Sequence, residues 1–335
     1  MTETATNDAI LAIRDLRTCF RTRGGVVTAV DGVSLEVTPG ECLGVVGESG
    51  SGKSVTFASV MGLIKVPGSI ESGSIRFQGR ELVGLDAAAY RRLRGKDIAM
   101  TMQDALTALN PAYTVGDQIT EVLLAHDDSL SGGGRARLRQ AREKALEMMR
   151  LVGIPSPERR LADYPHQFSG GMRQRIMIAI ALACRPKLLI ADEPTTALDV
   201  TIQAQVLELI AEIRRKLGMS VVLITHDLGV VAEYCDRVVV MYAGQVVESG
   251  PTRAVIETPL HPYTRGLLGS IPRLSDLGER IRPIEGMVPE LIDLPPQCRF
   301  RDRCDRAAPE CSAAIPMRAV AGGRQVRCLF PGDPA

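Results

Sequence analysis

The segment that decides the fold runs from residue 42 to residue 64 and reads CLGVVGESGSGKSVTFASVMGLI. Its first five residues, Cys42–Val46, form a short apolar run, which predicts a buried parallel strand. Gly47–Ser54 then fits the pattern G-x-x-x-x-G-K-[ST] in full, and the apolar periodicity that continues to about Ile64 predicts a helix. Glycines let backbone N–H groups surround phosphate oxygens, and the helix N-terminus adds the positive end of its dipole. This stretch therefore predicts a loop that binds the phosphates of a nucleotide.

Two side chains of this loop suit nucleotide chemistry. The Lys53 ammonium group would reach the β- and γ-phosphates, and the Ser54 hydroxyl would bind Mg²⁺. Kinases, GTPases, helicases and transport ATPases all use such a loop, so other segments must identify the class. The residues expected to bind the nucleotide here are Gly47, Glu48, Ser49, Gly50, Ser51, Gly52, Lys53, Ser54 and Val55.

A second buried strand is predicted at Leu188–Ala191, within the segment KLLIADEPTTALD. It delivers Asp192 and Glu193 at its C-terminal end, which is where ligands bind in open α/β sheets. Asp192 suits a Mg²⁺ ion held through water, and Glu193 suits a general base that polarises the water attacking the γ-phosphate. A solvated acidic pair would be the simpler reading in a chain without a phosphate loop. Here the pair predicts catalytic residues.

The segment FSGGMRQRIMIAIALA, which starts at Phe168, predicts another helix that begins with exposed backbone donors. Ser169, Gly170 and Gly171 precede this helix and suit a phosphate group. One nucleotide needs only one such loop. We therefore expect the second loop to bind the nucleotide of a neighbouring subunit.

The bulk composition is that of an ordinary globular chain. The 335 residues are 45% hydrophobic and 24% charged, which suits one large domain and a smaller one. The net charge of +1 gives no basic footprint for nucleic-acid binding. The first ten residues, MTETATNDAI, lack the features of a signal peptide, and the apolar run Ile176–Cys184 is far shorter than the ~20 residues of a membrane span. We expect a soluble, cytosolic chain, in which disulfides are rare.

The remaining segments show two kinds of periodicity. Residues 9–80 and 237–249 alternate apolar and polar positions, which predicts an antiparallel layer beside the nucleotide-binding sheet. Between Gln103 and Phe168 the pattern becomes helical, with one amphipathic helix expected to end at Gly153. Its apolar face is formed by Leu138, Ala141, Ala145, Met149 and Val152.

These ordered motifs resemble those of the ATP-binding-cassette (ABC) ATPases over nearly the whole chain. Gly47–Ser54 resembles the Walker A loop, Leu188–Glu193 the Walker B strand and Phe168–Met172 the signature motif. The resemblance implies an α/β P-loop NTPase fold, with a RecA-like mixed sheet and flanking helices, an antiparallel β layer and a helical subdomain. The commonest signature ends in Gln where this chain has Met172, which points to a specialised subfamily or to a heterodimer with inequivalent sites.

The resemblance assigns further residues to the site. Gln103 resembles the Q-loop glutamine, which contacts the metal and the attacking water, and His226 resembles the switch histidine, which contacts the γ-phosphate. Ala197–Asp199 resembles the D-loop. Phe20 lies where the family often places an aromatic ring that stacks on adenine, although Arg21–Arg23 separate it from the following glycine. The implied cofactors are ATP and Mg²⁺.

Beyond residue 250 the chain continues with TPLHPYTRGLL (residues 258–268), a proline-rich stretch (272–296) that suits a solvated linker, and a cysteine-rich end. Together with FSGGMRQR and QDALTALNP, this extension resembles the ATPases of oligopeptide, dipeptide and nickel importers. The implied domains are a nucleotide-binding domain at 1–257, with its helical subdomain at about 104–185, and a small Cys-rich C-terminal domain at 258–335. The implied function is ATP hydrolysis that energises the import of short peptides. Import of nickel or another small solute is the alternative.

This resemblance also implies partners and a location. The partners are a second ATPase subunit (a paralogue, giving a heterodimer), two membrane permease subunits and a separate substrate-binding protein. A coupling helix of a permease would enter a groove near Gln103, which places the chain peripherally on the cytoplasmic face of the cell membrane. Cassette proteins that act on nucleic acid insert coiled coils or zinc modules before the signature, and translation-type proteins carry two cassettes. Neither feature is in this sequence, and no nucleic-acid partner is expected.

Four of the eight cysteines, Cys298, Cys304, Cys311 and Cys328, lie in the last 38 residues. Their spacing is longer than the paired ligands of usual zinc sites, and four thiolates from one loop-rich segment suit a [4Fe–4S] cluster. Some members of the importer family carry such a cluster in this domain, so the resemblance implies a structural cluster here. Zinc and ordinary thiols are the alternatives. The other cysteines, expected in the core, are Cys19, Cys42, Cys184 and Cys235.

Overall fold

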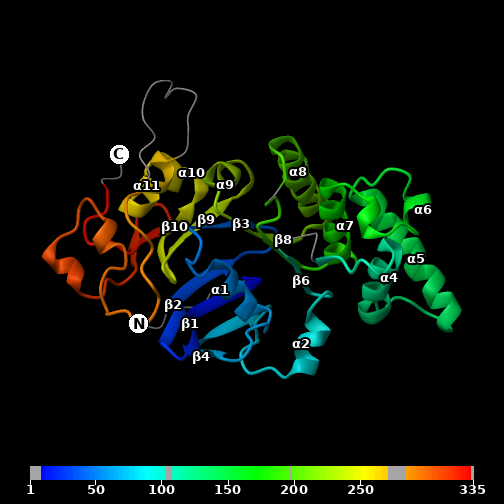
Figure 1. The fold of residues 1–335 in the computed structure, drawn as a ribbon, viewed down its shortest axis with the longest axis horizontal. Helices are drawn as coiled ribbons and strands as arrows, with labels where there is room; N and C mark the ends of the chain where they lie inside the picture. The colour runs from blue at the N-terminus through cyan, green and yellow to red at the C-terminus, as the bar shows by residue number, and fades with distance from the viewer. Residues whose placement is uncertain (1–8, 103–107, 197, 271–283, 333–335) are drawn as a thin grey trace. The chain divides into compact units, whose positions relative to one another are not determined.

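The computed structural model of the chain describes residues 9–102, 108–196, 198–270 and 284–332 (Figure 1). The chain divides into two compact units. The first comprises residues 1–84 and 223–335, and the second comprises residues 85–222.

The first unit begins with an antiparallel sheet in the strand order β2–β1–β4–β5 (Figure 1). One face of β1 is buried through Leu11, Ile13 and Leu16, whereas Arg14 and Arg17 are exposed. This alternation is typical of a sheet with one face on the core, and it confirms the predicted antiparallel layer. The strands are β1 (Leu11–Thr22), β2 (Gly25–Val37), β4 (Gly68–Phe77) and β5 (Arg80–Glu81).

A second sheet in this unit carries the phosphate loop. Strand β3 (Cys42–Val46) is buried at every residue, as predicted, and pairs in parallel with β9 (Arg237–Tyr242). Strand β9 pairs antiparallel with β10 (Gln245–Pro251), which continues through β12 (Arg324–Val326) to β11 (Arg318–Val320). The placement of residues 237–249 in the antiparallel layer is therefore wrong. Residues 238–242 form a continuous buried run, which is typical of a parallel strand covered on both faces.

The helices of the first unit are short. Helix α1 (Lys53–Val60) follows the phosphate loop and ends earlier than the predicted Ile64, because Gly62 adopts a left-handed φ of 59°. The others are α9 (Leu228–Tyr234), α10 (Thr252–Glu257), α11 (Pro262–Gly269) and two 3₁₀ turns at Arg301–Arg303 and Pro309–Ser312.

A buried carboxylate anchors the C-terminal region to β10. The Glu248 side chain is fully buried and accepts hydrogen bonds from the backbone N–H groups of Leu260 and His261, both at 2.9 Å. It also pairs with the buried guanidinium of Arg324 at 2.7 Å. Both carboxylate oxygens therefore have partners, which is what makes a buried ion pair tolerable.

Part of the proline-rich stretch is ordered against β2. The backbone N–H of Thr28 donates to the carbonyl of Leu291 at 2.9 Å, and the N–H of Asp293 donates to Val26 at 3.2 Å. Val27 and Ile292 form an antiparallel bridge. The prediction of a solvated linker is therefore wrong at residues 291–293, since they cover an edge of the antiparallel sheet.

The second unit combines a parallel strand pair with helices (Figure 1). The predicted amphipathic helix is confirmed: Ala141, Ala145, Met149 and Val152 are buried, although Leu138 is 39% exposed. This helix stops just before Gly153, which takes a left-handed φ of 72°. The elements are α2 (Ala87–Leu93), β6 (Ile98–Thr101), α4 (Val115–His126), α5 (Gly134–Leu151), α6 (Pro157–Arg160), a 3₁₀ turn (Pro165–Gln167), α7 (Gly170–Leu182), β7 (Leu188–Asp192) and α8 (Val200–Leu217), and β8 (Ser220–Thr225) spans the point of division.

None of the helices within the described ranges combines the length and apolar character that a membrane span requires.

Candidate functional site

The phosphate loop has two glycines at which a side chain would clash with the backbone. A Cβ on Gly47 would lie 2.1 Å from the Met241 carbonyl oxygen, and a Cβ on Gly52 would lie 2.3 Å from the Ala29 carbonyl oxygen. Gly52 also has a left-handed φ of 93°, immediately before α1 begins. The glycines thus allow the loop to turn tightly between β3 and α1, as the sequence pattern predicts.

Lys53 lies within the loop. Its side chain is buried, and its ammonium group donates to the carbonyl oxygens of Gly47 at 2.6 Å and Glu48 at 3.0 Å. A third contact reaches the hydroxyl of Ser51 at 3.3 Å. The backbone of the loop therefore determines where the lysine charge lies. Ser54, the expected Mg²⁺ ligand, is exposed.

Two further predicted residues belong to the same unit. Phe20 is half-buried near the end of β1, and its ring lies against Gly68, where a Cβ would approach the ring to 2.5 Å. His226 is exposed and follows directly after β8. Its neighbour Asp227 caps helix α9, so the position of the histidine is set by both elements.

The acidic pair lies in the second unit, at the C-terminal end of β7. Asp192 is buried and is the last residue of the strand. Glu193 adopts a left-handed φ of 44°, which is uncommon for a residue with a side chain and is typical of functional sites. The Thr196 hydroxyl donates to its carboxylate at 2.9 Å. The strand therefore ends one residue beyond the predicted Ala191, and a tight turn orients the glutamate.

The second glycine motif caps α7, also in the second unit. The Ser169 hydroxyl accepts a hydrogen bond from the backbone N–H of Met172 at 3.4 Å. Ser169 and Gly170 are exposed, whereas a Cβ on Gly171 would lie 2.6 Å from Ile202 of α8. Residue 172 contacts the cap through its backbone, so the unusual methionine leaves the cap itself unchanged.

Two predicted site residues, Gln103 and Ala197, lie outside the residues that the structure describes. The described site residues group by unit. The first unit holds the phosphate loop, Phe20 and His226, and the second holds the acidic pair and the Ser169 motif.

Glu48 has partners that the sequence analysis did not identify. Its carboxylate accepts hydrogen bonds from both terminal nitrogens of Arg303, at 2.7 and 3.1 Å. Its backbone N–H donates to the Tyr263 hydroxyl at 2.9 Å. The ion pair raises the pKa of the Arg303 guanidinium, and burial raises the pKa of Tyr263. No local pattern could have revealed these contacts, because the partners are more than 200 positions from Glu48.

The four C-terminal cysteines line one small cavity, together with His261 and Phe300. Cys311 is buried and the other three are half-buried. Backbone N–H groups donate to three of the sulfurs, each from the residue two positions later: Phe300 to Cys298, Arg306 to Cys304 and Phe330 to Cys328.

The electrostatics of this cavity disfavour free thiolates. Burial raises the pKa of Cys298 to about 11, and it also raises the pKa of Cys304 and Cys328. Burial likewise lowers the pKa of His261 to about 3, so this imidazole is neutral. None of the eight cysteines forms a disulfide, and within the described ranges no group of three or more His, Cys, Asp or Glu residues is arranged to hold a single metal ion. Cys19, Cys42 and Cys235 are buried as predicted, and Cys184 is half-buried.

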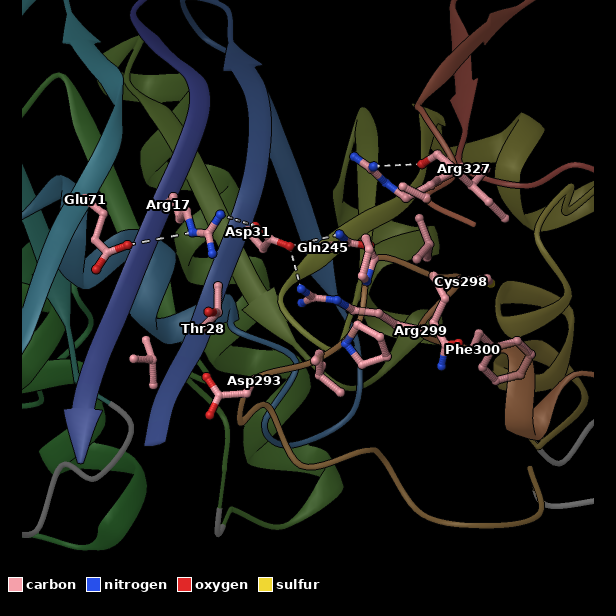
Figure 2. A pocket seen from close by; sticks show the side chains of 18 of the residues that line it. Arg17, Thr28, Asp31, Glu71, Gln245, Asp293, Cys298, Arg299, Phe300 and Arg327 are labelled. Carbon is pink, nitrogen blue, oxygen red and sulfur yellow. Dashed lines mark hydrogen bonds and ion pairs between the residues drawn. The ribbon is translucent and has the colours of Figure 1, made fainter. Parts of the chain in front are cut away.

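A larger cavity of about 670 Å³ lies between the antiparallel sheet and the C-terminal region (Figure 2). Its lining includes a connected polar network centred on Asp31. The Asp31 carboxylate pairs with Arg17 and accepts hydrogen bonds from Gln245 and Arg299. Its lining includes Cys298 and Phe300 but none of the phosphate-loop residues.

Comparisons with known proteins agree with this geometry. Residues 30–196 match the family model of the ABC transporter, and residues 247–311 match that of the oligopeptide/dipeptide transporter, C-terminal region. The dipeptide transport ATP-binding protein DppD of Haemophilus influenzae is 49% identical over 323 residues, with 96% of each chain covered. The protein of the same name from Bacillus subtilis is 51% identical over 314 residues, covering 93% of this chain and 92% of that protein.

Solved structures show the same fold. The ATP-binding cassette MJ0796, in a dimeric post-hydrolysis state bound to ADP and Pi, matches with a TM-score of 0.63 and 26% identity, over 72% of this chain and 99% of that one. The protein cbiO1 of Clostridium perfringens, part of the ABC transporter complex cbiONQ, matches with the same TM-score and identity, over 75% of this chain and 91% of that one. The predicted P-loop fold with its mixed sheet, antiparallel β subdomain and helical subdomain is confirmed. The chain thus belongs to the ABC transporter family, among the ATP-binding subunits with the C-terminal region of oligopeptide/dipeptide transporters.

Proposed function

We propose that this protein hydrolyses ATP to drive the import of short peptides through a membrane ABC transporter. The observation that carries the proposal is the phosphate loop joined to the oligopeptide-type C-terminal region, through the contacts of Glu48 with Arg303 and Tyr263. The dipeptide transport proteins that share about half of its residues over nearly the whole chain support the choice of peptides.

ATP hydrolysis in the assembled transporter, measured with added dipeptides, tests this function. Dipeptides should stimulate hydrolysis in vesicles that contain the permease subunits and the substrate-binding protein. Stimulation by Ni²⁺ and not by peptides would instead assign the chain to a metal importer.

The roles of the site residues follow from phosphoryl-transfer chemistry, in which catalysis is mostly positioning and charge stabilisation. Lys53 neutralises the β- and γ-phosphates, and Ser54 with Asp192 and Gln103 holds Mg²⁺. Glu193 is the general base for the attacking water. His226 contacts the γ-phosphate, and the ring of Phe20 stacks on the adenine.

The Ser169 motif acts on the nucleotide of a second subunit. Ser169 and Gly170 are exposed at the start of α7 and present donors to a partner, and a related cassette has been solved as a dimer with ADP and Pi. The second subunit is a paralogue, and the pair works with two permease subunits and a substrate-binding protein. The protein is peripheral on the cytoplasmic face of the membrane.

Ser169→Arg is expected to reduce hydrolysis at the partner's site by at least tenfold, because a bulky cation replaces the capping hydroxyl and blocks the helix N-terminus. This chain's own phosphate loop should still bind ATP with unchanged affinity. Equilibrium binding to the isolated chain and ATPase assays on the assembled pair measure the two effects. Full-rate hydrolysis by the isolated chain as a monomer would contradict a signature that acts on a neighbouring subunit.

We further propose that the four C-terminal cysteines hold a [4Fe–4S] cluster, with zinc as the alternative. Their spacing in the sequence is longer than that of the paired ligands in usual zinc sites. The four thiols line one cavity, which brings together cysteines from separate parts of the C-terminal segment. The N–H donors to three sulfurs are the hydrogen bonds that stabilise cluster thiolates. The cluster would clip a loop-rich domain together and has no part in ATP chemistry.

Anaerobically purified protein is therefore expected to be brown and to contain about four irons per chain. Cys304→Ser should lower the iron content and destabilise the C-terminal domain, whereas Cys19→Ser, at a buried cysteine of β1, should leave the iron content unchanged. Metal analysis and visible absorption measure both. Colourless protein with one zinc per chain would replace the cluster with zinc, and protein without either metal would leave ordinary thiols.

A further inference from the structure

We propose that the loop between Cys298 and Cys304 positions the phosphate loop for ATP, with Arg303 as the principal positioning residue. The two loops are linked in two ways within the first unit. Arg303 contacts Glu48 directly, whereas Arg299 is linked to Ser51 through the turn at Ala243 and Gly244. The C-terminal region thereby sets the affinity of the site for ATP.

The contact at Glu48 is a two-point ion pair. The side chain of Arg303 is only 7% exposed, and its two terminal nitrogens bind the two carboxylate oxygens of Glu48 at 2.7 and 3.1 Å. The remaining donors are occupied by the carbonyls of Glu285 at 2.9 Å and Ile284 at 3.2 Å and by the Tyr242 hydroxyl at 3.3 Å. A guanidinium that binds a carboxylate through two parallel hydrogen bonds fixes the orientation of the carboxylate as well as its distance. The Glu48 side chain therefore has one defined position.

The backbone of Glu48 is held from the same side. Its N–H donates to the hydroxyl of Tyr263, which is fully buried. Phe300, within the cysteine loop, packs against Tyr263 with ring centroids 5.4 Å apart and against Tyr242 at 5.2 Å. Arg303 lies over the Tyr242 ring at 5.7 Å. One aromatic cluster thus supports both anchors of Glu48.

The second contact runs through a tight turn. Arg299 of the cysteine loop donates to the Ala243 carbonyl and pairs with Asp31, as Figure 2 shows for the aspartate. The next residue of this turn, Gly244, donates its N–H to the Ser51 carbonyl at 2.9 Å. Arg299 therefore fixes the position of the Ala243–Gly244 turn, and this turn is hydrogen-bonded to the phosphate loop at Ser51.

These contacts bear on ATP because they fix the atoms around Lys53. Its ammonium group binds the carbonyls of Gly47 and Glu48 and the hydroxyl of Ser51. A shift of Glu48 would move both the lysine charge and the neighbouring N–H groups. Such displacement weakens nucleotide binding more than the later chemical step, because the general base Glu193 belongs to another segment.

The test compares Arg303→Met and Glu48→Gln with the control Arg301→Met in the full-length chain. Arg301 belongs to the same 3₁₀ turn, but its side chain hydrogen-bonds to Asp302, Gln297 and Ser312, none of which belongs to the phosphate loop. Binding of a fluorescent ATP analogue, the KM and kcat of hydrolysis, and thermal unfolding are measured for each. Arg303→Met should raise the Kd and KM for ATP roughly tenfold, with kcat nearly unchanged. Arg301→Met should match the wild type.

Glu48→Gln should give a similar rise, and the double variant should be no worse than either single one, because both remove the same contact. Arg303→Lys, which retains the charge without the fork, should fall between wild type and Arg303→Met and serves if the methionine variant does not fold. An unchanged Kd in folded Arg303→Met or Arg303→Lys overturns the proposal. So does a lower unfolding temperature with normal KM, which would mean that the pair is only structural.

Discussion

Glu193→Gln is expected to bind MgATP normally and to hydrolyse it about 10²–10⁴-fold more slowly, the range that a general base contributes. Glutamine has the shape of glutamate, and its carbonyl oxygen can still accept the bond that the Thr196 hydroxyl donates at 2.9 Å. The turn at φ 44° is therefore retained. An amide cannot take a proton from the attacking water, so only the chemical step is lost. Hydrolysis rates and equilibrium ATP binding measure the two parts separately.

The same variant should accumulate as a closed dimer with MgATP, because the bound nucleotide is not consumed. Size-exclusion chromatography of the paired ATPase subunits detects this species. Glu212→Gln is the matched control, since Glu212 is an exposed acid of α8 that pairs with Lys216 at 3.6 Å. It should hydrolyse ATP at the wild-type rate. Turnover by Glu193→Gln within a few-fold of wild type would remove Glu193 from the role of base.

Features that depend on neighbouring residues could be predicted from the sequence. Strand β3 covers the same residues as the predicted strand, and β7 ends at Asp192. Both are apolar runs bounded by polar or glycine residues, so periodicity and composition were sufficient. The capping role of Ser169 follows equally from local chemistry, because serine before two glycines suits a helix N-terminus.

Features that depend on distant residues could not be predicted. The pairing of β9 with β3 joins strands almost 200 positions apart, and a short apolar run fits either kind of sheet. Residues 291–293 pair with β2 although their surroundings are rich in proline. Arg303 and Arg301 are the same residue type two positions apart. Only the fold shows that the side chain of Arg303 is 7% exposed and pairs with Glu48, whereas that of Arg301 is 35% exposed and pairs with Asp302. Tertiary contacts decide such cases, and one sequence does not encode them in a readable pattern.

Lys53→Ala is expected to weaken ATP binding itself, in contrast to Glu193→Gln. The lysine charge would contact the β- and γ-phosphates, and hydrogen bonds to charged groups contribute about 1.5–3 kcal/mol each, so loss of two predicts roughly a 10²-fold or larger rise in Kd. The substitution also leaves the carbonyls of Gly47 and Glu48 without the ammonium donor that binds them at 2.6 and 3.0 Å. Equilibrium binding of ATP to the full-length chain measures the effect.

Two comparisons separate loss of charge from loss of loop structure in Lys53→Ala. Lys65→Ala removes an exposed lysine of the same unit and should leave both ATP binding and thermal unfolding unchanged. Lys53→Met keeps most of the buried volume without the charge, so it should bind ATP as poorly as Lys53→Ala while losing less stability. If Lys53→Met binds ATP like the wild type, the lysine is only an internal brace for Gly47 and Glu48. The phosphates would then be held by the backbone N–H groups of the loop and the N-terminus of α1 alone.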